Sequence, residues 1–169
     1  MLLFGHDLTE KRPLSQPGQY LAQERVTLKG PKGELTHVAV LGPCRREAQV
    51  EVSATDAKTL GMDPPVRLSG DLRGAVPITV IGSCGKLELS GAAILAQRHI
   101  HMTPEDAALH HVSQGELVDL KTLTERPVVF KQVAVRVSPD FRTYVHLDYD
   151  EANACGFRKG DLGMILRGH

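Results

Sequence analysis

Gln97-Arg98-His99-Ile100-His101-Met102-Thr103-Pro104-Glu105-Asp106-Ala107 joins a short strand pattern to the start of a helix. Side chains of successive strand residues point to opposite faces, so His99 and His101 share one face. Ile100 and Met102 then point the other way, into a core. The strand is predicted to end just after the histidines and to hold them at its rim, where solvent or substrate can enter.

Two imidazoles about 7 Å apart along one strand can share a metal ion, although two surface histidines on a half-exposed strand give the same pattern. His146 stands in the stretch Thr143–Asp148, which again alternates polar and apolar residues. Like His101, it is predicted to lie late in a strand, just before a capped helix. If these repeats pack as equivalent units, three imidazoles converge, as in an open catalytic zinc site. The alternative is a half-buried His146 without a ligand role.

Three segments share a cap residue, an acid three residues later and an alanine, and each predicts one short helix leading to a strand. These segments are Ser53–Ala57, Thr103–Ala107 and Asp148–Ala152. Two hairpins with Gly-x-x-Gly turns are predicted besides, at Arg25–Leu41 and Pro77–Ser90. The sequence therefore predicts a mainly β fold of small β-barrels whose ends are closed by short α-helices. We expect an N-terminal loop or short strand segment over residues 1–23, barrel A over 24–96 and barrel B over 97–169.

The composition argues against several classes of function. The 169 residues carry a formal net charge of zero and no tryptophan, so general binding to a nucleic-acid backbone is not expected. The same neutral charge argues against a small DNA-binding barrel, which is kept as an alternative. No apolar run is long enough to cross a membrane, and no secretory leader opens the chain. Three widely spaced cysteines favour free thiols in a reducing cytoplasm.

Two further residues of the first repeat invite a functional interpretation. Glu51 alternates with Val50 and Val52, and it can be a metal ligand, a general base or an ordinary exposed acid. Arg45 follows a turn, and its planar guanidinium suits phosphate, although an arginine in a loop is more often solvated. The remaining histidines are interpreted as non-functional: His6, His37, His110, His111 and His169.

Several specific motifs follow one another along the chain: Arg12–Gln19, Gly42-Pro43-x-Arg45 followed by Glu51-Val52-Ser53, Ser69-Gly70-Asp71-Leu72-x-Gly74, Arg98–Ala107 and Val137-Ser138-Pro139. In these motifs and in their order, over almost its whole length, the chain resembles the PduL-type phosphotransacylases.

This resemblance implies an enzyme that reversibly converts an acyl-CoA and phosphate into an acyl phosphate and CoA, with propanoyl or acetyl as the acyl group. It also implies two capped β-barrels and a two-metal site, usually zinc, between them. Carried over by position, His99, His101 and His146 would hold one metal, Glu51 would help to hold the other, and Arg45 would bind the attacking phosphate. The CoA-contacting residues stay unassigned. A homodimer, a role in propanediol degradation and a bacterial microcompartment, including contact with its shell, are left open.

The chain departs from this family pattern at its start. Family members begin with a further strand that bears a second His-x-His, and Met1 aligns downstream of it. We therefore expect either a late start or a paralogue with one complete zinc site instead of two. The alternative to an active phosphate acyltransferase is accordingly a catalytically impaired barrel that binds metal or CoA.

Overall fold

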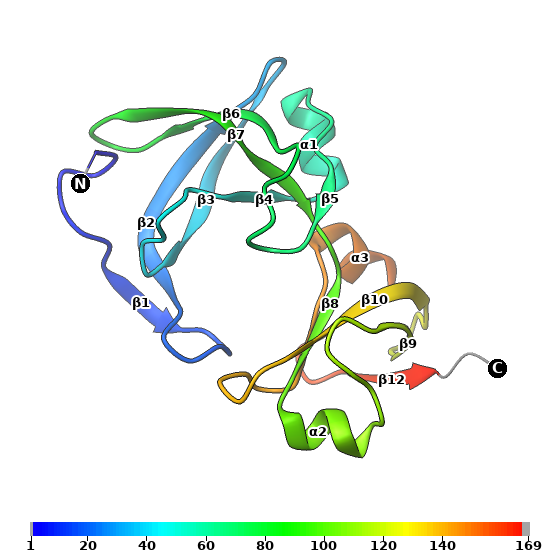
Figure 1. Cartoon of the computed structure of the whole chain (residues 1–169). Coiled ribbons are helices and arrows are strands. Elements are labelled where there is room, and N and C mark those ends of the chain that lie inside the picture. Colours follow the sequence, from blue (N-terminus) through cyan, green and yellow to red (C-terminus); the bar gives the residue numbers. More distant parts are fainter. Residues whose placement is uncertain (1, 167–169) are drawn as a thin grey trace. The chain divides into compact units, whose positions relative to one another are not determined.

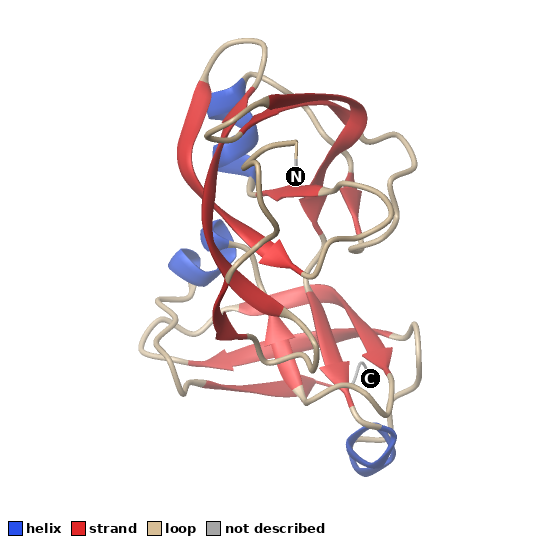
Figure 2. Cartoon of the chain, turned by 90° about the vertical axis from the view of Figure 1, so that its left-hand side faces the viewer, coloured by secondary structure: helices blue, strands red, loops and turns tan. Residues whose placement is uncertain are grey.

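Strands are the main regular secondary structure of the described residues, and the three helices found there are short (Figures 1 and 2). The computed structural model describes residues 2–166. It contains two compact units, Met1–Ala96 and Gln97–His169, which are described here one at a time. The predicted mainly β fold with helical caps is confirmed, and one sheet curls into a half-barrel. No helix of the described residues has both the length and the apolar character needed to span a bilayer.

The first unit is built on a seven-stranded sheet with one helix. Its elements are β1 (Glu10–Pro13), β2 (Tyr20–Lys29), β3 (Glu34–Gly42), β4 (Val50–Val52), α1 (Ala54–Leu60), β5 (Val66–Arg67), β6 (Val76–Ile81) and β7 (Lys86–Ala96). The strands pair in the order β1-β2-β6-β7-β4, with β3 added to β2 and β5 added to β7. The long strands β2 and β7 each pair with several neighbours, which lets the sheet bend around an apolar core that includes Leu28, Leu60 and Ile78.

Both Gly-x-x-Gly segments are hairpin turns, as the sequence predicted, and each turn also receives another part of the chain. In Gly30–Gly33 the backbone N–H of the third residue donates to the Leu60 carbonyl at the end of α1. In Gly82–Gly85 the third residue donates in the same way to the Leu3 carbonyl. A side chain at any of the four glycines would collide with the docked segment, so glycine is required for close approach.

The second unit contains a five-stranded sheet and two helices. Its elements are β8 (His99–Met102), α2 (Pro104–Leu109), β9 (Leu117–Leu123), β10 (Val129–Val137), β11 (Tyr144–His146), α3 (Tyr149–Ala154) and β12 (Leu162–Leu166). The order is β11-β8-β10-β9-β12, with β8 parallel to β10 and the other pairs antiparallel. This order places β8 between β11 and β10, where it is paired on both edges.

Helix capping follows the sequence pattern at all three helices. Ser53 and Asp148 form reciprocal capping boxes at α1 and α3. Thr103 accepts from the Asp106 backbone N–H at α2, with Pro104 in the first turn. The Asp106 carboxylate, however, accepts from the Thr143 hydroxyl, so it ties α2 to the segment before β11. The capping-box-like arrangement expected there is thus only half present.

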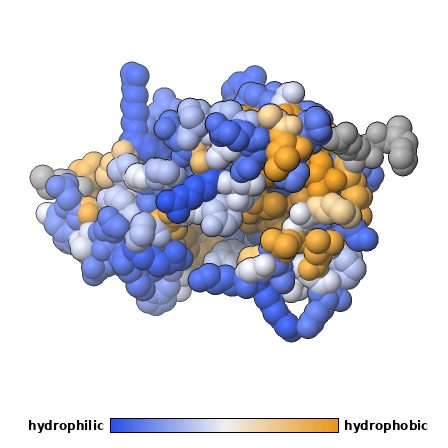
Figure 3. Space-filling view, turned by 90° about the horizontal axis from the view of Figure 1, so that it is seen from below, coloured by the Kyte–Doolittle hydropathy of each residue, from blue (hydrophilic) through white to orange (hydrophobic). Residues whose placement is uncertain are grey.

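The face shown in Figure 3 carries both polar and apolar side chains, and the apolar ones gather on part of it. In the second unit, Leu162 of the edge strand β12 pairs with Leu123 of β9, and both are exposed. The core of this unit lies on the other side of the sheet and includes Val118, Leu120, Val133 and Cys155.

Candidate metal centre

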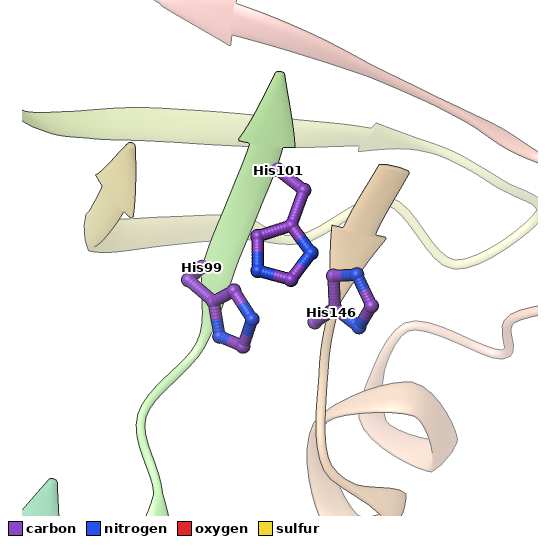
Figure 4. A group of neighbouring side chains, drawn as sticks. All are labelled: His99, His101 and His146. Atoms are coloured by element: carbon purple, nitrogen blue, oxygen red, sulfur yellow. The ribbon is translucent and has the colours of Figure 1, made fainter. Parts of the chain in front are cut away.

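Three histidine side chains of the second unit point toward one another (Figure 4). His99 and His101 come from β8 and His146 from β11. One potential ligand atom from each lies within 4.8 Å of the others. The ring centroids are 4.6 Å apart for His99 and His101, 4.7 Å for His99 and His146, and 4.4 Å for His101 and His146. The structure therefore brings together the three imidazoles that the sequence singled out.

Strand register explains why these three residues meet. β11 pairs antiparallel with β8, so His146 at the end of β11 lies opposite His99 at the start of β8. His101 follows two residues later on the same face. Ile100 and Met102, which alternate with these histidines along β8, are buried in the opposite core, as the alternation predicted. His146 joins the cluster as the direct cross-strand neighbour of His99.

His99 and His101 are more enclosed than a strand rim would make them. His99 is 8% exposed and His101 is 3% exposed. Phe141 helps to enclose His101, because the two rings stack with their centroids 4.1 Å apart. Phe141 lies in the segment between β10 and β11, three residues after Ser138. Nothing in its local sequence pattern identified it as part of the site.

Two of the imidazoles, those of His101 and His146, are set up to be neutral, which is the form that binds metal. The His99 Nδ1 lies 2.9 Å from the Gln97 carbonyl oxygen, so Nδ1–H donates, which leaves Nε2 as the potential ligand atom of this ring. Burial lowers the pKa of His101 to about 3 and that of His146 to about 4, and the neighbouring imidazole and Arg136 charges act in the same direction. Both rings are therefore unprotonated at neutral pH.

The donor set fits a zinc ion. The His146 Nε2 is buried and has no hydrogen-bond partner among the described residues. Such an orphaned atom costs about 1–3 kcal/mol, which a bound cation would offset. Tetrahedral zinc with Zn–N bonds of about 2.0–2.1 Å places its nitrogen ligands about 3.3 Å apart. The three nitrogens here need only small side-chain rotations to meet that spacing, and the remaining coordination positions are left for other ligands.

Arg98, which directly precedes the first histidine, is held by three kinds of contact. Its Nη1 donates to Glu151 Oε1 at 2.6 Å, and its Nε donates to the Lys131 carbonyl at 2.9 Å. The guanidinium carbon also lies 5.7 Å from the centroid of the Phe130 ring. Two of these contacts link the start of β8 to β10, and the third links it to α3.

The ion pair between Arg98 and Glu151 connects the chain on both sides of the cluster. Arg98 is one residue before His99. Glu151 belongs to the capping box of Asp148, which follows His146 by two residues. The bridge therefore fixes the spacing between the start of β8 and the end of β11 independently of the strand pairing.

The two other predicted site residues, Arg45 and Glu51, lie in the first unit and share a hydrogen-bonded network there. Arg45 Nη1 donates to Ser69 Oγ at 3.2 Å, and Gln49 Nε2 donates to the same oxygen at 3.0 Å. Gln49 Nε2 also donates to Glu51 Oε1, while Gln49 Oε1 accepts from the Gly70 N–H at 2.7 Å. Gln49 thus connects two motif segments that the sequence left separate.

The histidines interpreted as non-functional come from segments other than β8 and β11. His37 is in β3, His110 caps the end of α2, and His111 follows it in the turn. His6 precedes β1, and its Nδ1 contacts the Asp7 carbonyl. His169 lies outside the described residues.

Comparison with known proteins supplies the class of enzyme. A family model described as phosphate propanoyltransferase matches residues 1–158, which is nearly the whole chain. With its β-rich fold and the cluster of three imidazoles, the chain is an enzyme of the acyltransferase class.

Individual relatives agree with that match. The phosphate propanoyltransferase of Clostridioides difficile is 50% identical over 163 residues, covering 96% of this chain and 78% of the relative. That of Listeria monocytogenes is 51% identical over 163 residues, covering 96% and 76%. That of Salmonella typhimurium is 50% identical over 153 residues, covering 90% and 73%. The chain belongs to the phosphate propanoyltransferase family, and the resemblance found in its motifs is confirmed.

Proposed function

We propose that the chain transfers a propanoyl group between CoA and inorganic phosphate, with zinc held by the three histidines. The observation that carries this proposal is the convergence of His99, His101 and His146 in a chain of this family. The reaction forms a bond between a phosphate oxygen and the acyl carbon, and it breaks the bond between that carbon and the CoA sulfur. Acetyl-CoA is proposed as a second, smaller substrate.

The donor atoms of this chain have separate tasks in that reaction. His99 Nε2, together with one nitrogen each of His101 and His146, would hold the metal. Zinc in such a site supplies a Lewis acid that polarises a thioester carbonyl and stabilises a leaving thiolate. Glu51 is proposed as a ligand that supports a second metal, on the strength of the resemblance. Arg45 is proposed to bind phosphate, since its guanidinium offers paired donors to phosphate oxygens.

The enclosure of the imidazoles supports acyl transfer to phosphate over loss of the acyl group to water. His101 is almost fully covered, with Phe141 stacked on it. A site with little water slows hydrolysis of the thioester and of the acyl phosphate product. The same low-dielectric surroundings strengthen the attraction between a metal and an anionic substrate.

The test is a thiol-release assay on zinc-loaded protein with propanoyl-CoA, run with and without phosphate. Phosphate-dependent release of CoA, with propanoyl phosphate as the second product, is the expected result. Acetyl-CoA in place of propanoyl-CoA measures the acyl preference. CoA binding without any turnover would instead support a catalytically impaired barrel that binds metal or CoA, and it would overturn the proposed activity.

A further inference from the structure

A cationic side chain with no assigned role lies beside the three imidazoles. β10 runs parallel to β8, and Arg136 of β10 is the register partner of His101. Residues in register on paired strands present their side chains on the same face of a sheet. Arg136 therefore shares the imidazole face. Val133, three residues earlier on β10, is buried in the opposite core.

An aromatic ring holds this guanidinium in place next to the cluster. The Arg136 guanidinium carbon lies 5.9 Å from the Phe141 ring centroid, in a cation–π contact. The same Phe141 ring stacks on His101 at 4.1 Å. The positive charge of Arg136 also contributes to the lowered pKa of His101 and of His146, after burial and the other imidazoles. The guanidinium is thus close enough for its field to act on the imidazoles.

The charge of Arg136 is not neutralised by the protein. Among residues 2–166, no carboxylate forms an ion pair with it. By contrast, the other arginine that flanks the cluster, Arg98, is paired with Glu151. A half-buried cation next to three metal-binding imidazoles repels a metal ion unless an anion lies between them. The geometry therefore calls for an anionic ligand at this place.

We propose that Arg136 is a second arginine, besides Arg45, that binds the phosphate group that accepts or donates the acyl group. This inference rests on the proposed function, because phosphate oxyanions are substrates only in that reaction. A planar guanidinium can donate two parallel hydrogen bonds to one phosphate. The phosphates of CoA carry the same chemistry, but the long pantetheine arm separates them from the thioester. A group beside the metal ligands is therefore suited to the reacting phosphate instead.

The experiment compares Arg136→Ala with Arg142→Ala, an exposed arginine six residues away for which the structure records no ion pair among the described residues. Inorganic phosphate is titrated into each zinc-loaded protein by calorimetry in chloride buffer. We expect Arg136→Ala to weaken phosphate binding at least about tenfold, as loss of a charged hydrogen-bonding pair does. Arg142→Ala should stay within about twofold of wild type. Arg136→Lys, which keeps the charge and most of the stem, should give an intermediate affinity.

Steady-state kinetics distinguish a contact with inorganic phosphate from a contact with the phosphates of CoA. Arg136→Ala should raise KM for phosphate and leave KM for propanoyl-CoA within about twofold. A rise in KM for propanoyl-CoA alone would overturn the assignment. Two calorimetric results would overturn it as well: equal phosphate affinity of Arg136→Ala and Arg142→Ala, or no phosphate binding by the wild-type protein. Zinc content and melting temperature confirm that each variant is folded, and Arg136→Lys serves if the Ala variant is not.

Failure of this inference is distinguishable from failure of the proposed function. If the wild-type protein turns over and Arg136→Ala binds phosphate as tightly as wild type, the proposed acyltransferase reaction stands and Arg136 has no part in it. Phosphate binding that depends on Arg136 in a protein without turnover retains the anion site and overturns the proposed reaction.

Discussion

His101 is the single residue on which the candidate metal centre depends most directly. Its ring lies close to both other imidazoles and stacks on the Phe141 ring, and only 3% of its surface is exposed. Its side chain makes no contribution to the opposite core, which is filled by Ile100 and Met102. A change at this position should therefore affect metal binding more than folding.

We expect wild-type protein to retain about one zinc after dialysis and His101→Ala to lose it. Removing a group that merely orients a ligand lowers metal affinity about 10- to 100-fold, so removing a ligand should cost at least about 100-fold. The measurement is elemental analysis with a competing chelator. The matched control is His110→Ala, at the end of α2, which should keep its zinc. Equal zinc in wild type and His101→Ala would show that the three-histidine site is wrong.

Protonation of the buried imidazoles should make the stability of the metal-free protein depend on pH. The pKa of His101 is lowered to about 3 and that of His146 to about 4 in the folded chain, against 6.5 when unfolded. Below pH 6.5 the unfolded chain thus binds more protons than the folded one, and folding stability falls with falling pH. We expect a decline in urea midpoint from pH 7 to pH 4. His146→Gln should flatten this decline, and an unchanged pH dependence in that variant would contradict the assignment.

The secondary-structure elements around the site are linked by a few specific contacts between their ends. Arg98, directly before β8, and Glu151 in α3 form an ion pair that links the first histidine-bearing strand to the helix after β11. Glu151 is 16% exposed and Arg98 33% exposed, so water screens this pair only partly. The surface pair of Arg158 and Glu125 is an exposed counterpart in the same unit.

Arg98→Ala should loosen the metal site as well as destabilise the second unit. Loss of a charged hydrogen bond to a partly buried carboxylate costs about 1–3 kcal/mol. Because the bridge fixes the spacing between His99 and His146, we also expect about a tenfold loss of zinc affinity and an altered cobalt absorption spectrum. Arg158→Ala is the control, with a stability change below about 0.5 kcal/mol. A lower melting temperature with unchanged zinc affinity and cobalt spectrum would reduce the bridge to a stabilising contact.

Local sequence signals predicted the secondary-structure elements well. The candidate metal centre, by contrast, depends on the pairing of strands that are distant in the sequence. The caps at Ser53, Thr103 and Asp148 and the alternation around Ile100 depend on residues close in sequence, which a pattern can reveal. The pairing of β11 with β8 joins residues more than 40 positions apart, and no local pattern contains it. For this reason the three histidines were predicted, but the way in which they meet was not.

The same limit explains the neighbours that the sequence missed. Arg136 and Phe141 reach the cluster only through the parallel pairing of β10 with β8 and the turn that follows. Gln49 gains its place in the first unit from a hydrogen bond to Ser69, 20 residues away. Each of these residues is unremarkable within its own segment, so only the three-dimensional structure identifies it.

Across the whole molecule, the proposed roles are distributed over both units. The first unit holds Arg45 and Glu51 in one network, and the second holds the three imidazoles and Arg136. The family match extends over residues 1–158 and so includes all of these side chains. Both units are therefore needed for the proposed activity, which is phosphate-dependent acyl transfer that requires metal at His99, His101 and His146.

The most direct test of that claim is a zinc titration of chelator-treated protein, with thiol release from propanoyl-CoA measured at each step in the presence of phosphate. We predict that activity rises in proportion to bound zinc, and that His101→Ala shows neither tight zinc binding nor activity over the same range. Full turnover in the zinc-free chain, or in His101→Ala, would contradict the account.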